Sequence, residues 1–340
     1  MCARAARPGM GIATDITVEN KRLYSDLLGS FSTGESGAIK RSVLSIFDER
    51  AEIKASHPIN SAQEGIGYFS DIVVPLMGAL EGLSRLNYVM IGGEYLGTEW
   101  VTSTGYYYGH FTHPLFGIPP SKRLAFLRFG EFHRIEDGRI LESQVFLGLA
   151  ELIIALGLWP LGKSQGYEGV VPGPSTQDGI NFGPSDPAKS RETASLVEDM
   201  LLGLATEDCA WRPYWDGRMV WYGPGGFGSY ATVDAFGAFQ RPFEQAFEGW
   251  GDGQNEGISG VGSSGKAGDG EYAFLNGWPQ ITGIHVNPFM GIEPTHKRVF
   301  MRDCDWWRCE GGKIVENWCM VDTLHLVYQL GRDVLAELLG

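Results

Sequence analysis

Residues 303–322, DCDWWRCEGGKIVENWCMVD, predict a β-hairpin. β-Branched and aromatic residues fill both runs, and the Glu-Gly-Gly-Lys segment at 310–313 supplies the glycines that a tight turn favours. Because side chains alternate along a strand, Trp318, Met320 and Asp322 share one face. A carboxylate on such a face is costly to bury unless something there uses it; the alternative is a solvated residue at the strand end.

The same pattern occurs earlier in the chain. Residues 109–157 align without a gap with residues 283–331, at an offset of 174 (283 − 109). Residues 47–50 align with residues 215–218 at an offset of 168 (215 − 47), so the second copy has gained six residues in between. The aligned pairs include Arg128 with Arg302, Glu131 with Asp305, Gly138 with Gly312, and Glu142 with Glu316. A repeat of this length indicates two copies of a whole domain.

Composition narrows the classes of protein that remain. The 340 residues suffice for two domains of ordinary size, and 43% hydrophobic content suffices for their cores. A net charge of −14 argues against nucleic acid and anionic membranes as partners. No window approaches the roughly 18 to 20 apolar residues of a membrane span. The five cysteines form no C-x-x-C pair, which favours free thiols in a reducing cytoplasm, and the N-terminus lacks the apolar core of a secretory signal.

Each copy follows one order of elements: two helices, a strand, a further helix, and about four mostly antiparallel strands. We expect a flexible N-terminal extension at 1–18, domain 1 at 19–161, a Gly/Pro-rich irregular linker at 162–187, and domain 2 at 188–340. Residues 249–270 are expected to form a loop that holds the six-residue gain. The predicted class is α+β, with a curved antiparallel sheet in each copy, helices on its concave face, and no sheet shared between copies.

A family pattern is carried in copy one by residues 110–120, and in copy two by residues 221–224, 291–295, 305–308, 316–318, 322 and 329–331. In these segments both copies resemble the SnoaL-like polyketide cyclases of the nuclear transport factor 2-like (NTF2-like) superfamily. This resemblance implies two tandem cone-shaped domains, each with a pocket at its mouth, and a cofactor-free aldol cyclisation of a polyketide ester. It also implies that Asp322 is the general acid/base, since an apolar pocket raises a carboxylate's pKa toward the working pH.

The candidate site lies in copy two. The expected catalytic residues are Asp322, His285 and Asp305, with Asp305 and its counterpart Glu131 weighed equally as structural. Asp322 is expected to point into a cone lined by Tyr222, His285, Arg302, Trp306 and Trp318. The remaining substrate-binding candidates, each of which could instead be ordinary core or surface, are Trp221, His325, Tyr108, His110 and Glu131. No phosphate-cradling glycine motif and no metal quartet is correctly spaced, so neither cofactor nor metal is expected.

Copy one differs from copy two at the expected catalytic position, because Gly148 aligns with Asp322. Copy one is therefore predicted to be degenerate or supporting, paired with copy two as an intrachain pseudo-dimer, with a homodimer as a further option. The leading functional hypothesis is a cyclase or isomerase acting on a hydrophobic, oxygenated small molecule. The alternatives are a non-catalytic binder of such a molecule, and a hydrolase or dehydratase on the same fold.

Overall fold

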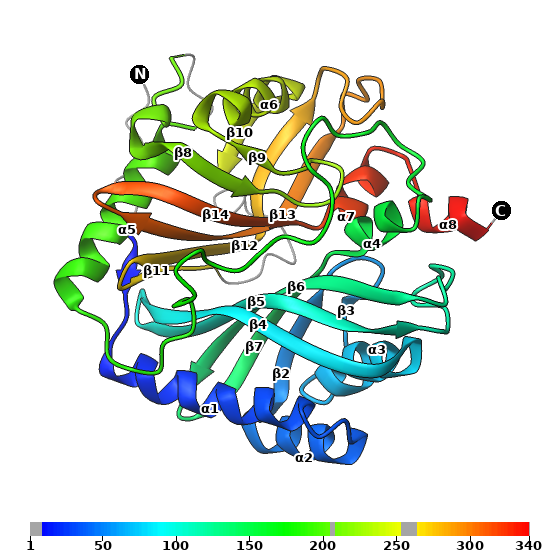
Figure 1. Cartoon of the computed structure of the whole chain (residues 1–340), viewed down its shortest axis with the longest axis vertical. Coiled ribbons are helices and arrows are strands. Elements are labelled where there is room, and N and C mark those ends of the chain that lie inside the picture. Colours follow the sequence, from blue (N-terminus) through cyan, green and yellow to red (C-terminus); the bar gives the residue numbers. More distant parts are fainter. Residues whose placement is uncertain (1–8, 205–207, 253–263, 340) are drawn as a thin grey trace.

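The computed structural model describes residues 9–204, 208–252 and 264–339 (Figure 1). The helices and strands of the first copy and its N-terminal approach are β1 (Gly11–Ile12), α1 (Asp15–Phe31), α2 (Ser36–Ile46), β2 (Phe47–Ala55), β3 (Asn60–Ser61), the π-helical η1 (Tyr68–Val73), α3 (Val74–Ala79), β4 (Leu80–Tyr95), β5 (Thr98–Phe111), β6 (Leu124–Glu136), β7 (Arg139–Leu147) and α4 (Leu149–Ala155). Those of the second copy are α5 (Pro187–Leu202), the 3₁₀ turn η2 (Arg212–Tyr214), β8 (Trp215–Tyr222), β9 (Tyr230–Ala231), α6 (Val233–Ala246), β10 (Phe247–Asp252), β11 (Gly265–Asp269), β12 (Tyr272–His285), β13 (Arg298–Glu310), β14 (Lys313–Val321), α7 (Thr323–Gln329) and α8 (Val334–Leu339).

The strands of the two copies follow one order. In the first copy it is β3-β2-β7-β6-β5-β4, and in the second copy β9-β8-β14-β13-β12-β11. The β2–β7 pair and the β8–β14 pair are parallel, and the long strands β5–β6–β7 and β12–β13–β14 are antiparallel in both copies. The predicted hairpin is β13–β14, and the α+β class is confirmed. The expectation of a loop over 249–270 is wrong in part, because residues 249–252 belong to β10 and residues 265–269 form β11; residues 253–263 lie outside the described residues.

The expectation that each copy keeps a sheet of its own is wrong. The two-residue strand β1 pairs with β4 of the first copy through Ile12 and Glu94, and with β11 of the second copy through Gly11 and Ala267. A Cβ at Gly11 would lie 1.7 Å from the Glu94 carbonyl oxygen, so only glycine allows this approach. The hydrogen-bonded sheet is therefore continuous across the two copies.

The expectation of a flexible extension over residues 1–18 is wrong for residues 9–18, which hold β1 and the start of α1; residues 1–8 lie outside the described residues. Besides β1, helix α1 begins at Asp15, because Thr14 caps it: the Thr14 hydroxyl accepts from the Thr17 amide, and the Thr17 side chain accepts from the Thr14 amide. Helix α5 begins with Pro187 at its first position, as the sequence predicts, and the Asp186 side chain caps it.

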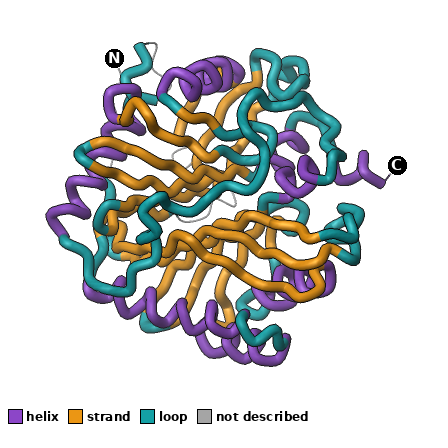
Figure 2. The backbone as a smooth tube through the Cα atoms, viewed as in Figure 1, coloured by secondary structure: helices purple, strands orange, loops and turns teal. Residues whose placement is uncertain are grey.

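The two halves of the sheet pack against each other (Figures 1 and 2). Helices α1, α2 and α3 cover the outer side of the first half and α6 that of the second, whereas α4 and α7 lie side by side where the halves meet. Between the halves lies a buried cluster, the inter-sheet cluster, which includes Phe132, Phe274, Trp306, Trp318 and Met320. Phe132 stacks on Trp306 with ring centroids 4.9 Å apart, and the Trp306 Nε1 donates to Thr102 Oγ1 at 3.0 Å. We call this side of each strand its inter-sheet face and the opposite side its helix face.

Residues 162–186, which we call the strap, form none of the helices or strands, yet they bridge the two copies. The Met90 amide donates to the Gly179 carbonyl at 2.8 Å, and the Val171 amide donates to the Tyr106 hydroxyl at 2.7 Å. On the second copy, Trp318 Nε1 donates to the Pro172 carbonyl at 2.9 Å. These partners satisfy polar groups that would otherwise be buried alone at the rim of the inter-sheet cluster.

The packing of Trp306 predicts a structural rather than a substrate-binding role for this side chain. Trp306 is 0% exposed, so Trp306→Ala removes its stacking and leaves a cavity, at a cost of about 3–5 kcal/mol. We expect the urea unfolding midpoint to fall accordingly, whereas Leu339→Ala, at a side chain 75% exposed, should leave it unchanged. A Trp306→Ala protein that unfolds at the wild-type midpoint would contradict this role.

Candidate active site

Asp322 lies at the boundary between the two copies. It caps the N-terminus of α7, where its Oδ1 accepts from the His325 amide at 3.3 Å. Its Oδ2 accepts from Arg302 Nη1 at 3.0 Å and from the backbone amide of His57, in the first copy, at 2.9 Å. Burial raises the pKa of Asp322, and Arg302 offsets part of that rise. The carboxylate is thus bound from both copies.

Arg302 contacts Asp322 as predicted, but the predicted lining by Tyr222, Trp306 and Trp318 is wrong. Trp306 and Trp318 belong to the inter-sheet cluster, and Tyr222 stacks on Trp318 at 5.5 Å. The guanidinium of Arg302 lies 4.5 Å from the centroid of Trp278, another member of that cluster. The alternation along β14 is as predicted, but the face that Trp318 shares with Met320 packs against the other copy instead of lining a cone.

Asp305 lies on the helix face of β13. It shares this face with Trp307, two positions along the strand, and pairs in register with Cys319 on β14, and both of these residues belong to the core that packs on the helices. The Asp305 Oδ1 accepts from Asn317 Nδ2 at 2.9 Å, and Cys319 contributes a further hydrogen bond. Burial raises the pKa of Asp305 to about 6, and these two hydrogen bonds lower it only in part. Among the described residues Asp305 makes no ion pair.

Glu131, the counterpart of Asp305 in the first copy, is held very differently. Arg85 forms a two-pronged ion pair with it, at 3.0 Å to Oε1 and 2.9 Å to Oε2. The hydroxyls of Tyr24, Tyr107 and Tyr68 also donate to the carboxylate, at 2.7, 2.8 and 3.0 Å. Burial alone would raise the pKa of Glu131, but Arg85 and His133 together outweigh it and hold this pKa well below its usual range. Glu131 is therefore a permanent anion in a saturated network.

Three of the residues that contact the Glu131 carboxylate are replaced by apolar residues at the equivalent positions of the second copy. Tyr68 corresponds to Phe236 (offset 168), and Tyr107 corresponds to Ile281 (offset 174). His133, whose Nε2 lies 3.4 Å from the Glu131 carboxylate, corresponds to Trp307. The two copies thus carry carboxyl groups at equivalent positions, one saturated with donors and one retained in an apolar, aromatic setting.

Several buried donors in the second copy have no hydrogen-bond partner. Within the described ranges they include the indole Nε1 atoms of Trp211, Trp215 and Trp307. All three tryptophans belong to the core on the helix side of the sheet. Since buried polar groups normally find a partner, these indoles are candidates to donate to a ligand oxygen.

His285 lies far from Asp305. Its neighbour Ile284 pairs with Arg298, which is seven positions (305 − 298) along β13 from Asp305, or about 23 Å. The His285 Nδ1 accepts from the Thr295 amide at 3.2 Å, its ring lies 5.4 Å from that of Phe247, and its Nε2 has no partner among the described residues. Burial lowers the pKa of His285, which favours the neutral ring. The predicted catalytic set of Asp322, His285 and Asp305 is therefore not brought together.

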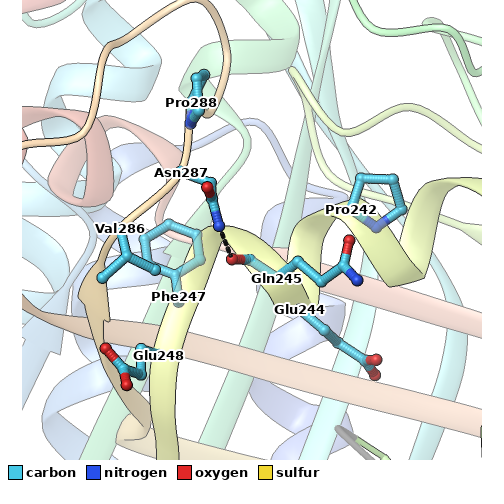
Figure 3. Close-up of a pocket in the computed structure, with 8 residues that line it drawn as sticks. All are labelled: Pro242, Glu244, Gln245, Phe247, Glu248, Val286, Asn287 and Pro288. Carbon is cyan, nitrogen blue, oxygen red and sulfur yellow. Dashed lines mark hydrogen bonds between the residues drawn. The ribbon is translucent and has the colours of Figure 1, made fainter. Parts of the chain in front are cut away.

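A surface hollow of about 560 Å³ lies near His285 (Figure 3). It is lined by Pro242, Glu244, Gln245, Phe247, Glu248, Val286, Asn287 and Pro288, and the Asn287 Nδ2 donates to the Gln245 carbonyl at 2.7 Å. None of these eight residues was a predicted site residue. The lining offers carboxylates and amides at the end of α6 but contains neither of the buried acids.

The remaining predicted residues are dispersed. Trp221 packs on Phe236 and Phe239, both at 5.2 Å, on the helix side of the second copy. Tyr108 stacks on Phe126 at 5.7 Å, and His110 is exposed. His325 has a pKa lowered to about 3 by burial, and its Nδ1 accepts from Gln329 Nε2 at 3.1 Å.

Asn317 and Arg85 are the residues that the sequence interpretation missed. Asn317 carried a signal, because it stands between Glu316 and Trp318 and must therefore face the opposite side of β14. Arg85 carried none, since it reaches Glu131 from β4, a strand that is not a sequence neighbour of β6.

A known family matches the segment that carries Asp305 and Asp322. Residues 279–330 match the family model described as SnoaL-like polyketide cyclase, and they contain β13, β14 and α7. The chain is thus SnoaL-like in this segment, as its resemblance predicts.

Three solved structures that match each span less than half of the chain. AclR from Streptomyces galilaeus is 20% identical, with a TM-score of 0.35 over 42% of this chain and 97% of AclR. IdmH from Streptomyces antibioticus is 17% identical, with a TM-score of 0.32 over 41% and 99%. An NTF2-like protein from Burkholderia xenovorans LB400 is 14% identical, with a TM-score of 0.33 over 42% and 97%. No curated protein matches the chain.

Two searches of the described residues concern other classes of site. None of the helices there is both long and apolar enough to cross a membrane. In the same ranges, no group of three or more His, Cys, Asp and Glu side chains is placed to hold a metal ion.

The saturated network around Glu131 predicts a strong dependence on Arg85. Arg85→Met leaves a carboxylate buried without its cation, which should lower the free energy of unfolding by about 3–5 kcal/mol. Adding Glu131→Gln removes the buried charge and should recover part of that loss. Denaturant unfolding measures both effects, with Arg218→Met, at a side chain 93% exposed, as the unchanged control. A single variant as stable as the wild type would show that the ion pair is dispensable.

Proposed function

We propose that the chain is a SnoaL-like cyclase or isomerase, acting by general acid/base catalysis on a hydrophobic, oxygenated small molecule of polyketide type. The observation that carries this proposal is the contrast between Asp305 and Glu131. Asp305, buried with a pKa of about 6, exchanges a proton near neutral pH, whereas Glu131 is held as an anion by Arg85. The reaction is therefore assigned to the second copy, with the first copy supporting it.

Asp305 can serve both halves of an aldol cyclisation. Its carboxylate removes a proton from a carbon next to a carbonyl group, and the resulting enolate carbon forms a bond to a second carbonyl carbon of the same molecule. The alkoxide that results takes the proton back from the Asp305 carboxyl group, so no other reactant is consumed. Trp307, two positions along the same strand face and thus about 7 Å away, offers an indole N–H to the developing oxyanion.

The two halves are proposed to be two NTF2-like domains paired through their sheets as an intrachain pseudo-dimer. The equivalent strand orders and the inter-sheet cluster support this arrangement. It leaves the helix face of the second copy, with Asp305, as the side on which a ligand is enclosed.

The matched variant Asp305→Asn tests the assignment. It keeps the shape but removes the proton carrier, so turnover should fall by about two to four decades. A panel of β-polyketone esters, followed by mass spectrometry, measures turnover, and tryptophan fluorescence measures binding, which should survive. Asp216→Asn, at a partly exposed position on β8, is the control expected to keep full activity.

Three outcomes would redirect the proposal. Full turnover by Asp305→Asn would place the chemistry elsewhere. Saturable binding without turnover by the wild-type protein would favour the non-catalytic binder. A product of hydrolysis or of dehydration in place of a ring would identify the chain as a hydrolase or a dehydratase.

The pKa of Asp305 also predicts the pH dependence of the reaction. The ionised carboxylate is the base that starts it, so kcat/KM should rise with pH and level off above about 6. Below this value the rate should fall about tenfold per pH unit, because the ionised fraction does so. A profile that is flat between pH 4.5 and 7.5 would exclude Asp305 as the base.

A further inference from the structure

The first copy binds the glycine-rich run Gly223-Pro224-Gly225-Gly226, which takes no part in the proposed reaction. Arg128 donates to the carbonyl of Gly223 at 3.2 Å and to that of Tyr222 at 3.4 Å. The Gly225 amide donates to the carboxylate of Glu151, which also pairs with Arg128 at 3.4 Å. A Cβ at Gly225 would lie 2.5 Å from the Glu151 backbone nitrogen, so glycine is required by the neighbouring copy rather than by a ligand.

The second copy binds the equivalent loop of the first copy in the same way. Arg302 donates to Asn60 Oδ1 at 2.8 Å and pairs with Asp322, which accepts from the His57 amide at 2.9 Å. The ring of His57 also stacks on that of Tyr328, with centroids 5.1 Å apart. Each copy thus presents one arginine and one carboxylate to one loop of the other.

These contacts are related by the sequence repeat. Arg128 and Arg302 are equivalent at the offset of 174, and His57 and Gly225 are equivalent at the offset of 168. The carboxylates are not equivalent, because Gly148 stands opposite Asp322, and Glu151 lies three residues after Gly148. Any Cβ at Gly148 would lie 3.1 Å from the Glu151 carboxyl group. The backbone amides of the equivalent residues His57 and Gly225 each donate a hydrogen bond to a carboxylate of the other copy. The two carboxylates, Asp322 and Glu151, come from positions that are not equivalent.

We propose that two ion pairs, which we call latches, hold the two copies together. Arg128 with Glu151 binds the 223–228 loop of the second copy, and Arg302 with Asp322 binds the 56–60 loop of the first copy. The inference goes beyond the proposed function: it gives Asp322 a role in docking the two copies, at the position where the family resemblance implies the acid/base. The partner of each latch is the other half of the same chain. Arg128 is 0% exposed, so loss of Glu151 would leave its charge buried without a counterion. Asp322 is 3% exposed, so loss of Arg302 would do the same to its carboxylate.

Amide hydrogen exchange of the intact protein tests the latches, with Asp322→Asn and Glu151→Gln as a matched pair. Asp322→Asn should speed exchange in the 56–60 segment by about tenfold or more and spare the 223–228 segment. Glu151→Gln should do the reverse. Gly217→Ala, where no atom lies within 4 Å of the added Cβ, is the control, whereas Gly225→Ala should loosen the 223–228 segment.

The reciprocal pattern separates docking from chemistry. If Asp322→Asn leaves exchange at 56–60 unchanged, or if either variant loosens both loops equally, the latches are refuted. Should Asp322→Asn fail to fold, Asn60→Ala removes the acceptor of Arg302 without burying an unpaired charge, and it should still speed exchange at 56–60 alone. The readout does not depend on turnover, so a failure of the Asp305 assignment leaves this test intact.

Discussion

The packing of the two sheet halves against each other is the interaction on which the rest of the structure depends. Phe132 on Trp306 lies in that contact, and Thr102 satisfies the indole N–H that the contact buries. Because side chains alternate along each strand, assigning Trp306 to this contact also assigns Asp305 and Trp307 to the opposite face. The face of β13 that packs against the other copy therefore separates the residues that hold the copies together from the residues that can contact a ligand.

The two copies show how one carboxyl position can take two chemical characters. In the first copy, Arg85 and three tyrosine hydroxyls surround Glu131, and the network stabilises the anion at any physiological pH. In the second copy, the carboxyl of Asp305 keeps hydrogen bonds from Asn317 and Cys319 but forms no ion pair among the described residues, and the charge of Arg128 contributes least to lowering its pKa. Desolvation then dominates and brings the pKa to about 6. The difference accompanies the exchange of Tyr68, Tyr107 and His133 for apolar residues in the second copy, and the ion pair with Arg85 that Asp305 does not share among the described residues.

The boundary between the copies combines a hydrophobic centre with polar edges. The inter-sheet cluster supplies the buried apolar area, and the strap covers its rim with backbone partners for Trp318 and Tyr106. At the ends of the strands, arginines and carboxylates meet the backbone of loops from the other copy. Buried ion pairs of this kind add little net stability compared with apolar packing, but they penalise any alternative alignment of the two halves. They are suited to setting the register in which the copies dock.

The sequence by itself determined the duplication, the α+β class, the β13–β14 hairpin and the alternation of faces along it. Each of these follows from local propensity, from period-2 patterning or from the repeat, all of which are written along the chain. The sequence also identified Asp305 and Asp322 as unusual carboxylates. Only the tertiary structure decided which strand face meets the other copy and which meets the helices, because Trp318 on one face and Trp307 on the other are equally apolar. It also decided that Arg85 neutralises Glu131 and that Asp322 reaches His57, since these contacts join residues far apart in the chain and depend on how the two sheet halves pack.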